Sequence, residues 1–129
     1  IKVLVGKVKN TSSAVQTYSP VSIFDVQFAK PSLIDLDISK NQTVMVYVID
    51  GELKFHEDNQ IARKGQMIYL DQSSDMINLI SISPTGSYLV LAGEPLNEPV
   101  VRHGPFVTNT EGDMKQAILD FQNGKMGSL

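Results

Sequence analysis

Apolar and polar residues alternate along much of this chain, and that alternation constrains its fold more than any other feature. The segment LIDLDI places Ile34, Leu36 and Ile38 on one face and Asp35 and Asp37 on the other. The stretch VSIFDVQF follows a similar pattern, and VMVYVI replaces it by a continuous apolar run. Because successive side chains of a strand point to opposite faces, these segments are predicted to be half-buried strands.

Turn signals divide the chain into short segments. They occur at Asp50-Gly51, Asp58-Asn59, Lys64-Gly65 and Pro84-Thr85-Gly86. Asp-Gly is favoured in type I′ hairpin turns, so the strand that ends at Asp50 is expected to reverse directly into ELKF. The segments left between the turns are predicted strands near residues 60–63, 66–70, 75–83 and 87–92. Eight or more short strands at near-regular spacing predict an all-β barrel or sandwich over about residues 1–92.

One amphipathic helix is predicted at about residues 110–123. Thr110 is a good N-cap, and Asp113 stands three residues later, where a capping box has its acidic member. Gly124 follows where a helix stop is expected. The residues whose spacing predicts one apolar helix face are Met114, Ala117, Ile118 and Phe121.

Residues 93–109 form a predicted strap between the strands and the helix. Three prolines in this stretch exclude a helix and disfavour a central strand. A solvated linker is polar, whereas this stretch contains several apolar residues, so it is expected to be ordered and packed. The residues assigned to packing of the strap or of an interdomain junction are Leu96, Val101, His103, Pro105 and Phe106. Phe106 is predicted to be buried, because Gly104 and Pro105 shape the backbone immediately before it.

The composition excludes several classes of protein. With 129 residues, 42% of them hydrophobic, the chain is expected to form a single domain over residues 1–129. The lack of cysteine excludes disulfides, zinc–thiolate sites and cysteine nucleophiles. The longest apolar run is far too short for a membrane helix, and a net charge of −3 without a basic cluster argues against direct nucleic-acid binding. We expect a soluble, cytoplasmic domain, and its start without methionine suggests a piece of a longer chain.

Few side chains are candidates for chemistry. His56 is followed by Glu57 and Asp58, but neighbouring side chains alternate in direction, so a solvated hairpin end is expected there rather than a site of His plus carboxylates. His103 is expected in a structural role, since no nucleophile or second donor stands near it in the sequence. Asp35 and Asp37 share a strand face and are expected to point to solvent rather than to bind a cation. No catalytic and no metal-binding residue is assigned. The methionines predicted to fill the core are Met45, Met67 and Met76.

The segment VMVYVIDGELKF, followed by an Arg-Lys-Gly turn and QMIYL, resembles the hairpin of cupin barrels. Metal-binding cupins carry the motif G-x5-H-x-H-x3or4-E-x6-G, whose last glycine would be Gly51. No histidine stands at the matching positions between Asp37 and Lys40, Val44 replaces the glutamate, and Met76 replaces the histidine of the second cupin motif. The resemblance implies a cupin-type double-stranded β-helix (jelly-roll) barrel with one carboxy-terminal α-helix, and no metal in this domain.

The tail AGEPLNEPVVRHGPFVTNTEGDMKQAILDFQNGKMG is similar over its whole length to the carboxy-terminal signature of the pirin family. Thr108 and Met126 depart from that signature, where Met and Phe are expected, and both are packing-type changes. Pirins are bicupins whose amino-terminal domain holds one iron through three His and a Glu. The resemblance implies that this chain is the carboxy-terminal cupin only, that the amino-terminal cupin domain is its partner, and that no cofactor binds here.

Two functions remain open at this stage. In the first, the chain is the metal-free scaffold and interaction half of a bicupin. The iron site and a quercetin 2,3-dioxygenase or redox-linked transcription-cofactor role then lie in the absent half. In the second, the chain is an independent metal-free barrel that binds a small polar organic ligand. An enzyme needs titratable groups that point into its cavity, whereas the residues predicted to face the core are aliphatic. This difference favours the first function. Loss of the companion domain is also expected to leave an exposed seam that drives homo-oligomers, with residues 1–5 or the terminal helix at the contact.

Overall fold

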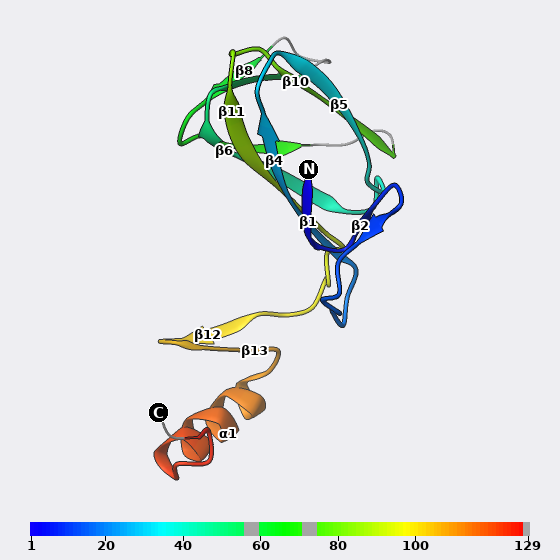
Figure 1. The fold of residues 1–129 in the computed structure, drawn as a ribbon. Helices are drawn as coiled ribbons and strands as arrows, with labels where there is room; N and C mark the ends of the chain where they lie inside the picture. Colours follow the sequence, from blue (N-terminus) through cyan, green and yellow to red (C-terminus); the bar gives the residue numbers. More distant parts are fainter. Residues whose placement is uncertain (56–59, 71–74, 128–129) are drawn as a thin grey trace. The chain divides into compact units, whose positions relative to one another are not determined.

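The computed structural model describes residues 1–55, 60–70 and 75–127. They form two compact units, which we call unit 1 (Ile1–Pro95) and unit 2 (Leu96–Leu129). Unit 1 holds the predicted strands, and unit 2 holds most of the predicted strap together with the helix (Figure 1).

Unit 1 is an all-β barrel built from two antiparallel sheets (Figure 1). Its strands are β1 (Lys2–Val5), β2 (Lys7–Val8), β3 (Thr11–Ser12), β4 (Val21–Phe28), β5 (Ser32–Asp37), β6 (Thr43–Asp50), β7 (Glu52–Phe55), β8 (Ile61–Arg63), β9 (Met67–Leu70), β10 (Met76–Ser81) and β11 (Gly86–Gly93). The five-stranded sheet has the order β1-β4-β11-β6-β9, and the four-stranded sheet has the order β5-β10-β7-β8. The short β2–β3 hairpin was not among the predicted strands.

Side chains from the inner faces of both sheets form one hydrophobic core. Its fully buried aliphatic residues are Val26, Leu36, Val44, Val46, Val48, Leu53, Leu79 and Val90. The alternation predicted for LIDLDI is confirmed, because Leu36 and Ile38 are buried whereas Asp35 and Asp37 are exposed. Burial of aliphatic surface on this scale is the main force that holds the two sheets together.

The turn between β6 and β7 differs from the predicted type I′ geometry. That turn needs positive φ at both central residues, and of Asp50 and Gly51 only Gly51 has it, at +85°. The predicted reversal into a paired strand is also wrong, because β7 pairs with β10 and β8, so the chain crosses from the five-stranded to the four-stranded sheet at this turn. The β6–β11 ladder is irregular at the same end, where Tyr88 pairs with Val48 but Ser87 pairs with Asp50.

Unit 2 contains a β-hairpin that the strap prediction did not include. β12 (Val101–His103) pairs with β13 (Phe106–Thr108), and Gly104 at the turn has a φ of +54°. The two strands form a sheet of their own, which agrees with the expectation that this proline-rich stretch is a poor central strand.

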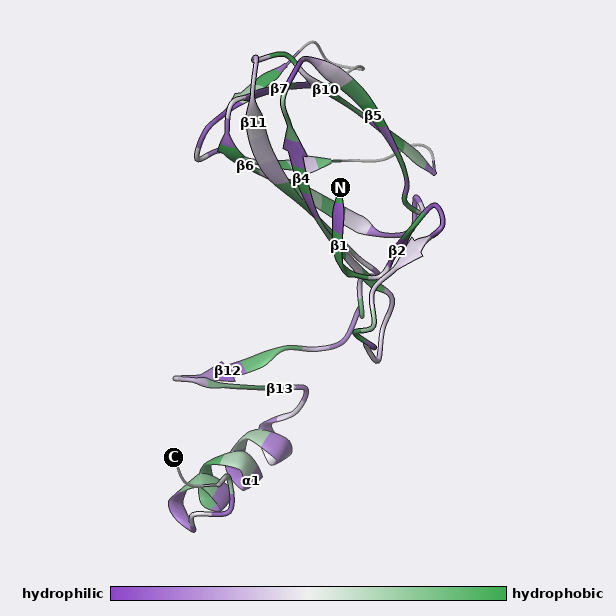
Figure 2. Ribbon diagram, viewed as in Figure 1, coloured by the Kyte–Doolittle hydropathy of each residue, from purple (hydrophilic) through white to green (hydrophobic). Residues whose placement is uncertain are grey.

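The predicted helix is confirmed as α1 (Glu111–Gln122), which packs against β13 and β12. The Thr110 hydroxyl accepts a hydrogen bond from the Asp113 amide at 3.1 Å and donates one to the Asp113 carboxylate at 2.6 Å. The helix ends at Asn123, and Gly124 follows with a φ of +69°. Apolar and polar segments both appear along it in Figure 2. Within the described residues, no helix combines the length and the hydrophobicity needed to cross a membrane.

The prediction that three methionines fill the core is wrong. Met45 lies between buried neighbours on β6 and faces outward, and Met67 and Met76 are 56% and 46% exposed. The register explains the difference: Val44 and Val46 take the inward positions of β6, so Met45 takes the outward position between them.

Candidate functional site

Some of the positions at which metal-binding cupins carry their ligands lie close together in this chain, but their side chains do not form a set of metal ligands. Met76 is the register partner of Asp37, so the end of β5 lies beside the start of β10. The backbone after Asp37 is tied to this place, since the Ile38 amide donates to the Asp75 carbonyl at 3.1 Å and the Lys40 amide to the Asp75 carboxylate at 2.7 Å. The position of the cupin glutamate is Val44, which is fully buried in the core.

These residues do not fit a catalytic metal. An iron or zinc ion needs several imidazole or carboxylate donors that converge on it, whereas the inward side chains here are almost all aliphatic. Among the described residues, no three His, Cys, Asp or Glu side chains gather closely enough to hold an ion. In the part of the chain that the structure describes, the interior of the barrel is packed mainly with apolar side chains.

The candidate polar residues lie on different elements. His56 falls outside the described residues. His103 is exposed on β12, where its register partner is Phe106. Asp35 faces outward on β5 and accepts a hydrogen bond from the Asn78 amide at 2.6 Å. An aspartate paired in this way on the surface of a sheet matches the expectation of a solvent-facing carboxylate.

One buried polar pair was not predicted. Tyr88 and Ser81 are both fully buried, and neither hydroxyl has a hydrogen-bond partner of good geometry. Burial raises the pKa of Tyr88 to about 12, and the nearby Ser81 hydroxyl offsets part of that increase. Tyr88 therefore keeps its proton at neutral pH and has no base beside it, so we assign it no role in catalysis. The only sequence signal for this pair was the hydroxyl of Tyr88 at a position of β11 that faces the core.

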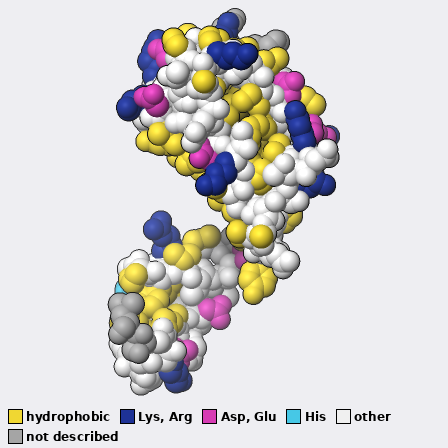
Figure 3. All heavy atoms as spheres, viewed as in Figure 1, with side chains coloured by type: hydrophobic (Ala, Val, Ile, Leu, Met, Phe, Trp, Pro, Cys, Tyr) yellow, Lys and Arg dark blue, Asp and Glu magenta, His cyan; other side chains and the backbone are white. Residues whose placement is uncertain are grey.

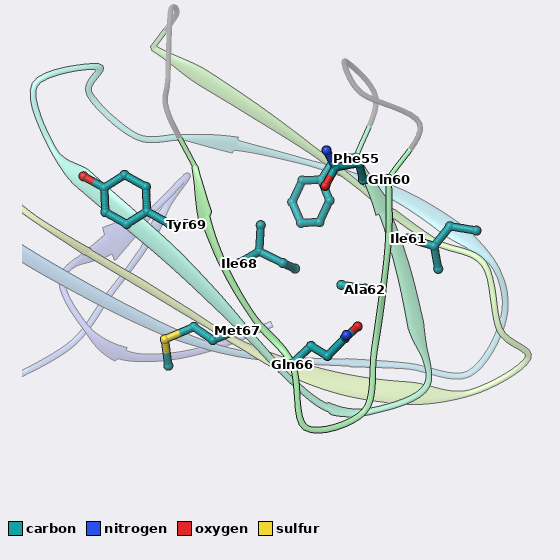
Figure 4. A pocket seen from close by; sticks show the side chains of 8 residues that line it. All are labelled: Phe55, Gln60, Ile61, Ala62, Gln66, Met67, Ile68 and Tyr69. Atoms are coloured by element: carbon teal, nitrogen blue, oxygen red, sulfur yellow. The ribbon is translucent and has the colours of Figure 1, made fainter.

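An open slot of about 320 Å³ lies between β8 and β9 (Figure 4). Figure 4 shows Phe55, Ala62 and Ile68 directed into the slot, while Met67 and Tyr69 point away from it. The Gln66 side chain is already used in part, since its amide oxygen accepts from the Arg63 backbone amide at 2.7 Å. Among the described residues that line it, the slot has an apolar base, amide groups at its edge and no charged side chain.

The strap residues assigned to packing have different environments in unit 2. Phe106 is half-buried and makes an edge-to-face contact with Phe121, with ring centroids 5.7 Å apart. Val101 is also half-buried, whereas Leu96, His103 and Pro105 are exposed.

The residues predicted to form the apolar face of the helix also differ in burial. Met114 is buried, Ala117 and Ile118 are half-buried, and Phe121 is 62% exposed even though its ring touches Phe106. Figure 3 shows hydrophobic side chains at the surface of both units.

Comparisons with known proteins agree with this architecture. Residues 23–127 match the sequence profile of the family described as Pirin C-terminal cupin domain. The chain is 36% identical to Pirin of Mus musculus, over 98% of this chain and 44% of that protein. It is 31% identical to Pirin-1 of Arabidopsis thaliana, over 98% of this chain and 45% of that protein.

A solved structure supports the same relationship. The crystal structure of quercetin 2,3-dioxygenase from Acinetobacter baumannii matches with a TM-score of 0.86 and 30% identity, over 98% of this chain and 43% of that protein. The predicted cupin barrel is thus confirmed, and this chain spans less than half the length of these relatives.

Proposed function

Because this chain belongs to the pirin family and is its carboxy-terminal cupin domain, we propose that it serves as the metal-free scaffold and interaction half of a longer protein. The iron site, and a quercetin 2,3-dioxygenase or redox-linked transcription-cofactor role, are then carried by the amino-terminal cupin domain. The observation that supports this most directly is the replacement of a cupin ligand by Val44, which is fully buried among aliphatic side chains. A site of this composition cannot activate oxygen.

Exposed apolar side chains in unit 2 support the interaction role. The large hydrophobic residues most exposed there are Leu96, Val100, Val107, Leu119, Phe121 and Met126. A 34-residue unit that leaves this many apolar side chains in water (Leu96–Leu129) buries little of its own surface. Such a unit gains stability when a partner covers it, and the companion cupin domain is the partner we propose.

The metal content of the full-length chain tests this function. We expect about one iron per chain in the wild type, and the same content after His56→Ala and after His103→Ala, because the ligands belong to the other domain. Turnover of quercetin should likewise survive both substitutions. Loss of iron in either variant would place a ligand in this domain and would overturn the proposal, and an iron-free full-length chain would do the same.

The slot between β8 and β9 supports a second candidate function, an independent barrel that binds a small polar organic ligand. Its volume of about 320 Å³ lies at the lower end of the usual size of ligand pockets. Quercetin can serve as the probe, with its absorbance followed during a titration of metal-free protein. This function predicts binding that Ala62→Leu abolishes, because Ala62 points into the slot (Figure 4). Unchanged binding in that variant would exclude the slot.

A further inference from the structure

The outer face of the five-stranded sheet is apolar across four strands. Buried residues alternate with less buried ones along β4, β6 and β11, so the second set points away from the core. The strand register arranges these outward side chains in rows. The first row is Ile23, Leu91, Met45 and Tyr69, and the second is Asp25, Leu89, Tyr47 and Met67. We call these two rows the outer face; seven of its eight members are apolar.

A groove adjoins the first row at one end of the sheet. Its volume is about 310 Å³, and it lies where the next register row reads Val21, Gly93 and Thr43. Gly93 supplies no side chain, so the space between its neighbours stays open. Two hydrogen bonds to the Pro20 carbonyl stabilise the backbone at the rim of the groove. The donors are the Glu94 backbone amide at 3.3 Å and the Gln42 side-chain amide at 3.4 Å. The groove is therefore shaped to receive an apolar side chain.

The other sheet shows that this composition is not a general property of the barrel. The outward positions of the four-stranded sheet include the charged residues Asp35, Asp37, Glu52, Lys54 and Arg63. Arg63 and Glu52 form an ion pair at 2.9 Å on that surface. Charged residues are typical of a sheet face in contact with water, whereas the two rows of the outer face hold one charged residue, Asp25.

The size of the outer face indicates what kind of partner covers it. Four strands spaced about 4.8 Å apart and three rows spaced about 6.8 Å apart give roughly 400 Å² including the groove. A stable complex between separate molecules buries about 800 Å² on each partner, whereas an interface between domains of one chain buries about 600–1,500 Å² in total. The face is thus too small to hold a second copy by itself and large enough for a covalently linked domain.

We infer that the outer face and its groove pack against the part of the longer chain that precedes Ile1. This inference rests on the proposed function and names the surface by which unit 1 meets its companion. β1 is an edge strand of the same sheet, so a chain entering at Ile1 arrives at the edge of this sheet. At that edge Lys2 stands opposite Asp25, so the one charge of the face has an opposite charge beside it. Apart from Glu94 at the groove, the surface that remains is uncharged and mostly apolar, and it suits an apolar sheet face or helix of the companion.

Oxidative labelling of methionines in the full-length chain tests the inference. Met67 on the outer face and Met76 on the other sheet are 56% and 46% exposed in unit 1, so they should oxidise at similar rates if nothing covers either. Because methionine oxidation follows access to solvent, docking of the companion should slow Met67 roughly tenfold relative to Met76. Mass spectrometry of peptides after a short exposure to peroxide measures both rates in one sample.

Two substitutions should raise the oxidation rate of Met67, and a control substitution should not. Leu91→Glu introduces a charge at the centre of the outer face, and Ile80→Glu is the matched control at a half-buried position of the other sheet, beside Leu33 and Lys54. Gly93→Val fills the groove without adding charge, and the nearest atoms to its Cβ are 3.8 Å away, so unit 1 should still fold. We expect Met67 to oxidise as fast as Met76 in the first and third variants only.

Cleavage at an engineered protease site before Ile1 separates the possible outcomes. If the cleaved halves stay together but Met67 reacts as fast as Met76, the inference is wrong while the proposed function stands. If Met67 already reacts as fast as Met76 in the uncleaved chain, and the halves also separate after cleavage, the proposed function and the inference are both wrong. Protection of Met67 in the released carboxy-terminal half would also overturn the inference. Unit 2 would then be the occupant if that half is monomeric by light scattering, and a second copy would be the occupant if it is dimeric.

Discussion

Substitution of Tyr88 by phenylalanine should change how the stability of unit 1 depends on pH. The Tyr88 side chain is fully buried, and burial raises its pKa from 10.0 to about 12. Below pH 10 the hydroxyl keeps its proton in both the folded and the unfolded chain. Between about pH 10 and pH 12 the unfolded chain loses this proton while the folded chain retains it, so the free energy of unfolding falls as the pH rises.

The size of this effect follows from the pKa values. A rise of about two pKa units corresponds to a loss of about 2 kcal/mol between pH 10 and pH 12. Tyr88→Phe removes the titrating group and keeps the ring, whose centroid lies 6.2 Å from that of Phe28. Near pH 8 the variant should be within about 1 kcal/mol of the wild type, because the lost hydroxyl makes no well-formed hydrogen bond.

Urea unfolding at pH 8, 10, 11 and 12 measures the difference. Lysine titration lowers the stability of both proteins over this range, so the quantity of interest is the gap between wild type and variant. That gap should widen in favour of Tyr88→Phe by about 2 kcal/mol. Tyr69→Phe, at a tyrosine that is 66% exposed, is the matched control and should stay parallel to the wild type. If wild type and Tyr88→Phe also stay parallel above pH 10, the buried hydroxyl does not control alkaline stability and our reasoning is wrong.

Three further substitutions test local features. Thr110→Ala removes the hydroxyl that caps α1 and should lower stability by about 1 kcal/mol, whereas Thr110→Ser should retain most of it; equal helix content by circular dichroism in both variants would argue against the cap. Phe106→Ala should cost roughly 1–2 kcal/mol, less than the 3–5 kcal/mol expected for a closed pocket, because the ring is only half-buried. An unchanged denaturation midpoint would show that its contact with Phe121 is not stabilising. Gly86→Ala should cost about 1–3 kcal/mol, since its Cβ would meet the Asp50 carbonyl and lie 2.6 Å from Phe28, and a wild-type melting temperature would contradict this.

Local chemistry in the sequence determined much of this fold. The helix limits follow from Thr110 and Gly124, because a side-chain oxygen that caps backbone amides and a glycine that accepts positive φ act within a few residues. The inward and outward residues of LIDLDI follow from charge, since burying Asp35 or Asp37 without a partner would be costly. The unsuitability of this chain for a cupin metal site also follows from the sequence, because Val44 cannot donate to an ion whatever its surroundings.

Only the tertiary structure decided which apolar residues became core and which became surface. In VMVYVI every residue is apolar, so alternation assigns Met45 and Val46 to opposite faces without saying which face points inward. The pairing of β6 with β11 and β9 settles that question, and it places Met45, Tyr69 and Leu91 together on an outward surface although they are distant in sequence. The burial of Tyr88 and Ser81 was decided in the same way. The candidate interaction surface is a property of strand register, and register is set by contacts between segments that the sequence order keeps apart.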